Sequence, residues 1–78
     1  MHVTKIELSD RYLHPVNRSD CARVSFFADG FITQVEAQAP RAAPQPDLIR
    51  DAIRQLKRMP EFRSGQDNLS FHPDCTVH

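Results

Sequence analysis

Histidine and cysteine side chains gather near the end of this chain, in the segment FHPDCTVH. His72, Cys75 and His78 fall within seven residues, and imidazole with thiolate is a ligand set that suits zinc. A closed structural zinc site takes four ligands, so Cys21 or His14 would have to approach from elsewhere. The chain has no C-x₂-C pair to strengthen this hypothesis. The alternative is an exposed His72 followed by mobile residues, with no cofactor bound.

Four cations are spaced to lie on one face of a predicted helix, opposite its apolar stripe: Arg50, Arg54, Lys57 and Arg58. This is how a helix presents positive charge to phosphate. Asp47 and Asp51 each precede an arginine by three residues, which offsets part of the charge. The chain has no known DNA-binding motif, no glycine-rich phosphate loop and no aromatic residue beside the cations. Nucleic-acid binding is therefore an alternative to a solvated helix face.

Catalytic chemistry has less support in the sequence. Cys21 and His14 would form a nucleophile and a base only if the fold brought them together. Carboxylate pairs, nucleophile elbows and cofactor fingerprints are absent from the sequence. A chain of 78 residues also leaves little room for a deep pocket. We expect a protein that is not an enzyme.

A β-hairpin is the clearest element that positions these side chains. Asp29 and Gly30 separate two apolar-rich runs, and Asp-Gly is favoured in a two-residue type I′ turn, where both residues need positive φ. The turn predicts strands at 22–28 and 31–38. Counting outward from it pairs four sets of residues on the apolar face: Ala28 with Phe31, Phe26 with Thr33, Val24 with Val35, and Ala22 with Ala37.

The other face of the hairpin is mostly polar, with Arg23 opposite Glu36 as a pair of opposite charges. Phe27 falls opposite Ile32 as an apolar exception. One interpretation is that the connection at 9–20, or Tyr12 within it, covers this pair. The other is an interface with a polar rim, in a homodimer for example. The candidate partner-binding residues are Phe27, Ile32, Arg23 and Tyr12.

Weaker patterns fill in the rest of the chain. His2–Leu8 alternates as a strand, with His2, Thr4, Ile6 and Leu8 on one face. Residues 9–20 then read as a long connection, which is where functional loops often occur. A proline-rich linker at 39–46 precedes a helix over about 46–59, followed by one helical turn with Phe62 inward. Asn68–His72 alternates as a last strand, which we expect to run parallel to the third.

Length and charge limit the remaining choices. The chain forms one small α+β domain over residues 1–78, a mainly antiparallel sheet packed on one amphipathic helix, and domains of this size often gain stability by associating. Ten basic and ten acidic residues balance overall, although residues 41–63 carry six basic and three acidic ones. No apolar run is long enough for a membrane span, and the two cysteines suit free thiols in the cytoplasm. We therefore predict a soluble, non-enzymatic protein-interaction or regulatory module, homodimeric or bound to another protein.

Overall fold

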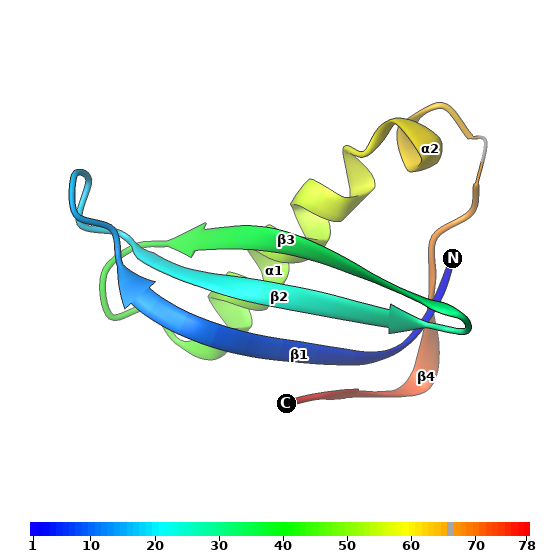
Figure 1. Ribbon diagram of the computed structural model, residues 1–78, viewed down its shortest axis with the longest axis horizontal. Coiled ribbons are helices and arrows are strands. Elements are labelled where there is room, and N and C mark those ends of the chain that lie inside the picture. Colours follow the sequence, from blue (N-terminus) through cyan, green and yellow to red (C-terminus); the bar gives the residue numbers. More distant parts are fainter. Residues whose placement is uncertain (66) are drawn as a thin grey trace.

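A four-stranded sheet with one long helix against it forms the frame of the protein (Figure 1). The computed structural model describes residues 1–65 and 67–78. The elements follow in the order β1 (His2–Leu13), β2 (Asp20–Ala28), β3 (Phe31–Ala39), α1 (Gln45–Lys57), α2 (Pro60–Arg63) and β4 (Ser70–Val77). The strands lie side by side in the order β3-β2-β1-β4. The predicted α+β class is confirmed, and the sheet is mixed because β4 runs parallel to β1.

The predicted hairpin register is confirmed along β2 and β3, from Ala28 opposite Phe31 to Ala22 opposite Ala37. The predicted type I′ turn is wrong. Gly30 has φ +87°, whereas Asp29 is not among the residues with positive φ. A negative φ followed by a positive one is the sign pattern of a type II turn, which needs glycine only at its second position.

β1 continues to Leu13, so the predicted connection over 9–20 is wrong at its start and the actual connection spans 14–19. β1 pairs with β2 from Val3 to Leu13 through two irregularities, one between Val3 and Lys5 and one between Ser9 and Tyr12. At each, β1 has one residue more than the facing stretch of β2. An extra residue in a strand reverses the alternation of its faces. Val3 and Ile6 are consequently both buried, although strict alternation predicted them on opposite faces.

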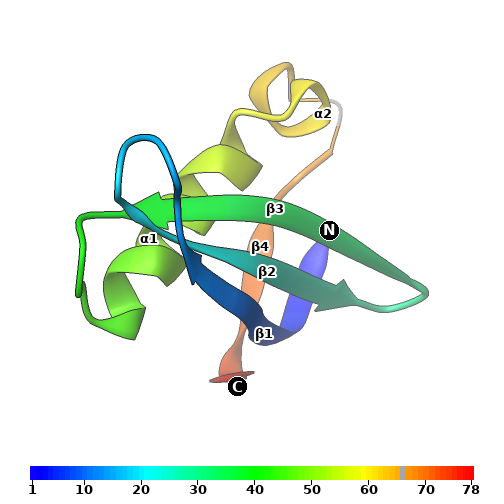
Figure 2. The ribbon, with the colours of Figure 1, turned by 60° about the vertical axis from the view of Figure 1, so that its left-hand side comes forward.

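α1 lies across β3 and β2 and leaves the β4 side of the sheet less covered (Figure 2). Its buried residues are Leu48, Ala52 and Leu56. They lie in the core with the inner face of the sheet, including Val24 and Phe26. The side chains that meet are fully apolar, so this layer supplies most of the hydrophobic stabilisation of the fold.

The helical region divides in two. α1 ends at Lys57, two residues before the predicted end, because Met59 precedes a proline and is extended, with ψ 142°. Pro60 then starts α2, the predicted extra turn, and Phe62 packs against the core as expected.

β4 runs in the same direction as β3, as predicted. β4 is parallel to β1, and β1 and β3 are both antiparallel to the β2 strand between them. The strand is longer and later than the predicted Asn68–His72. Its pairing with β1 jumps from Phe71 to Thr76 while β1 advances only from Val3 to Lys5. Pro73, which has no N–H to donate, lies in this interruption.

Candidate interaction surfaces

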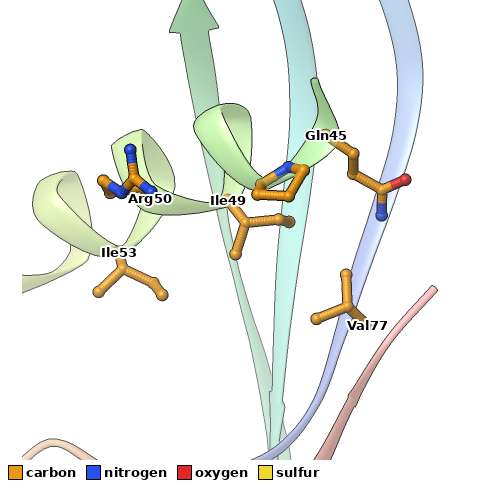
Figure 3. Close-up of a pocket in the computed structure, with 6 residues that line it drawn as sticks. Gln45, Ile49, Arg50, Ile53 and Val77 are labelled. Atoms are coloured by element: carbon orange, nitrogen blue, oxygen red, sulfur yellow. The ribbon is translucent and has the colours of Figure 1, made fainter. Parts of the chain in front are cut away.

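An apolar groove separates α1 from β4, on the inner face of the sheet. It has a volume of about 580 Å³ and is lined by Gln45, Pro46, Ile49, Arg50, Ile53 and Val77. Ile49, Ile53 and Val77 project into the space between the helix and the strand (Figure 3). The groove exists because one helix covers only part of the apolar face of a four-stranded sheet. We call it the α1–β4 groove.

The backbone of β4 is open beside this groove. His78 donates its N–H to the carbonyl of Ile6 at 2.8 Å and accepts the N–H of Leu8 at 2.7 Å. Adjacent residues of a strand direct their peptide groups to opposite edges, so the N–H and C=O of Val77 point away from β1. β4 is the last strand on its side of the sheet in the described residues. Val77 therefore offers a side chain to the groove and, as far as the described residues go, a free peptide group to the edge.

Two side chains of α1 close part of the opposite edge. Asp51 accepts the backbone N–H of Gln38 at 2.8 Å, and the Gln55 amide donates to the Glu36 carbonyl at 2.7 Å. Burial alone raises the pKa of Asp51, but hydrogen bonds from Gln38, Arg54 and Gln55 outweigh it and the pKa is lowered. Asp51 thus stays ionised and binds the β3 edge to the helix.

The four predicted cations line one depression together. It has a volume of about 380 Å³ and adjoins the α1–β4 groove, sharing Arg50 and Ile53 with it. Arg50 lies 3.5 Å from Asp47, and Arg54 pairs with Asp51. Within residues 1–65 and 67–78, no ion pair involves Lys57 or Arg58. One wall of the groove therefore leads into a surface with a net positive charge.

The predicted partner-binding residues divide between two parts of the outer sheet face. Phe27 is half-buried, with the Lys5 ammonium 4.9 Å above its ring, and Ile32 opposite it is 56% exposed. Tyr12 lies opposite Cys21, six residues along β2 from Phe27, so it does not cover the pair. Phe31 lies opposite Ala28, as predicted for the apolar face, but it is 50% exposed at the hairpin end. We call Phe27 and Ile32, on the other face, the hairpin patch.

Arg23 does lie opposite Glu36, but the predicted charge pair between them is replaced. The guanidinium of Arg23 binds Asp10 at 3.1 Å. Asp10 has φ 53° and lies in the second irregularity of β1, between Ser9 and Tyr12. No pattern in the sequence predicted this irregularity. Glu36 lies instead near Tyr12, and Glu36, followed by burial and by Cys21, raises the pKa of the Tyr12 hydroxyl to about 12.

The histidines and cysteines of the zinc hypothesis are not brought together. His72 accepts the backbone N–H of Asp74, His78 contacts Thr76, and Cys75 packs against the core, where burial raises its pKa. Cys21 lies opposite Tyr12, about 20 Å along β1 from the end that pairs with β4. No group of three His, Cys, Asp or Glu residues within the described part of the chain is placed to hold a metal ion.

The proposed nucleophile and base also have separate surroundings. The His14 ring accepts the backbone N–H of Val16 at 3.2 Å and so closes the β1–β2 connection. Cys21 is buried, and its thiol lies 3.9 Å from the carbonyl of Ser19. Both contacts stabilise the turn, and in the part of the chain that the structure describes no hydrogen bond joins the His14 ring to the Cys21 thiol.

No protein-family model matches the chain, and neither does a curated protein or a solved structure. In the residues that the structure describes, no helix has the length and apolarity needed to cross a membrane.

Proposed function

We propose that this protein is a non-enzymatic protein-interaction module and that the α1–β4 groove is its binding surface. The observation that carries the proposal is the coincidence of an apolar groove with an open strand edge at Val77. An extended peptide that pairs with such an edge gains backbone hydrogen bonds, and a neighbouring pocket takes its side chains. The two free cysteines, about 20 Å apart along the sheet, suit a cytoplasmic protein.

A photocrosslinking amino acid at position 77 tests this function. In cells that make the protein, benzoylphenylalanine in place of Val77 should yield a discrete adduct with a partner protein. Val16 is the matched control, because it is a valine that is 83% exposed on the β1–β2 connection and does not line the groove. A discrete adduct at position 77 but not at 16 supports the proposal. Equal yields at both positions, or no adduct at either, contradict it.

The hairpin patch carries a second candidate, a homodimer. Ile32 is 56% exposed beside the turn, where the β3 edge lies beyond the bonds from Asp51 and Gln55. Sedimentation equilibrium of the purified chain measures the state directly. Dimers that become monomers on Ile32→Asp support this candidate, whereas a monomeric wild type at high concentration removes it.

Nucleic-acid binding through Arg50, Arg54, Lys57 and Arg58 remains the alternative to a protein partner. Two of the four cations pair with aspartates, which reduces the charge available to phosphate. Binding of a labelled DNA or RNA duplex that weakens steeply with salt would favour this alternative. No retention on heparin at low salt would count against it.

A further inference from the structure

We infer that the α1–β4 groove takes an acidic, extended peptide segment that carries an aliphatic anchor residue. This inference rests on the proposed function and specifies the chemistry of the partner. Its two parts come from different walls of the same site: the apolar floor selects the anchor, and the adjoining cations select the charge.

The apolar part of the site is lined by aliphatic side chains. Ile49, Ile53 and Val77 supply branched surface without an aromatic ring for a base to stack on. Such a lining fits Leu, Ile or Val better than a nucleobase. The free peptide group of Val77 lies next to it, so a bound strand would direct alternate side chains into the groove.

The charged part of the site lies along α1. Arg50 borders both the groove and the neighbouring depression, where Lys57 and Arg58 have no ion-pair partner within the described residues. A peptide that follows β4 with its anchor in the groove places its flanking residues near this wall. Carboxylates there would meet a positive potential, which favours encounter and selects against basic partners.

The same cations disfavour a second copy of the chain as the occupant. A two-fold interface places the same patch on both subunits. Pairing two α1–β4 grooves would therefore bring Arg50 and Lys57 of one copy towards those of the other. An acidic segment of a different protein avoids this repulsion.

Selection from a display library of random twelve-residue peptides on the purified full chain tests the inference. The selected peptides should be enriched in Asp and Glu and should share a Leu, Ile or Val. In fluorescence anisotropy, one such labelled peptide should lose at least tenfold in affinity on Val77→Asp. The double variant Arg50→Glu with Lys57→Glu should also lose about tenfold, and a peptide with lysine in place of its acids should regain binding to it.

Two exposed positions outside the groove serve as controls. Val16→Asp and Arg18→Glu, both in the β1–β2 connection, should leave the affinity unchanged. Peptides that need Val77 but are neutral or basic would overturn the acidic partner and leave the interaction function standing. Peptides indifferent to Val77→Asp would overturn both. A DNA duplex that competes with the peptide and also loses affinity on the double charge reversal would overturn the peptide partner in favour of nucleic acid.

Discussion

The two edges of the sheet differ in how their backbone groups are satisfied. At the β3 edge, α1 supplies Asp51 to the N–H of Gln38 and Gln55 to the carbonyl of Glu36. At the β4 edge, Val77 directs its peptide group outward and its side chain into an apolar groove. Natural proteins cover or interrupt strand edges that must not associate. Under the proposed function, the covered edge stabilises the fold and the open edge receives the partner.

Removing core contacts on the covered side should have the largest effect. Leu48 is fully buried in the layer between α1 and the sheet, so Leu48→Ala should lower the free energy of unfolding by about 2–5 kcal/mol. Val77→Ala, on the open side, should cost less than about 1 kcal/mol because Val77 is half exposed. Urea unfolding followed by circular dichroism measures both. Equal losses would show that the β4 side is packed as tightly as the β3 side.

Breaking the polar closure of the β3 edge should have the next largest effect. Asp51→Ala leaves the N–H of Gln38 without its acceptor and removes one of the two acceptors of the Gln55 amide, a loss of about 1–3 kcal/mol in unfolding free energy. Asp47→Ala is the matched control on the same helix, because Asp47 also precedes an arginine by three residues but, among residues 1–65 and 67–78, its carboxylate pairs only with exposed Arg50. Its loss should be about 0.5 kcal/mol. If the two variants are equally stable, Asp51 does not hold the edge.

The stabilisation that Asp51 provides at the β3 edge should also depend on pH. The folded-state pKa of Asp51 lies below its ordinary value of 3.8, so its carboxylate stabilises the fold fully above that value. This stabilisation is lost as the pH falls through the lowered pKa. The difference in urea midpoint between the wild type and Asp51→Asn should therefore be largest near neutral pH and shrink at about pH 3. A difference that grows towards acid pH would reverse the sign of the proposed contribution.

Acid should also reduce the stabilisation that a second aspartate, Asp20, gives the fold. The Arg11 guanidinium, followed by the backbone N–H of Ala42, lowers the pKa of Asp20. The Asp20 carboxylate accepts a hydrogen bond from the Arg11 guanidinium of β1 at 2.8 Å and one from the Ala42 N–H at 2.9 Å. It therefore joins the start of β2 to β1 and to the segment that leads into α1. Asp20→Asn should lower the melting temperature at neutral pH more than in acid, measured by differential scanning calorimetry. An equal decrease at both pH values would contradict this role.

The covered side of the molecule was largely predictable from the sequence, and the open side was not. The Asp29-Gly30 pair and the alternation around it determine the hairpin, and the spacing from Leu48 to Leu56 determines the buried helix face. These signals are local. The groove depends on β4 lying beside β1 rather than β3, a long-range pairing that no short pattern encodes.

Irregular backbone explains the other differences. One register shift in β1 places Val3 on the opposite sheet face from the predicted one. The other lies at Asp10, which forms a salt bridge with Arg23. The four cations were identified correctly as neighbours because an i, i+4 ridge is a local property. Their adjacency to Ile53 and to a groove reaching Val77 follows only from the tertiary packing.

Site-resolved hydrogen exchange of three backbone amides would test most directly whether one edge is closed and the other open. The N–H groups of Gln38 and His78 are bonded to Asp51 and Ile6, so both should exchange at least about tenfold more slowly than that of Val77. His78 distinguishes an open edge from a frayed strand, because fraying would expose both neighbouring amides. We expect fast exchange at Val77 beside a protected His78. Protection of Val77 equal to that of Gln38 would contradict it.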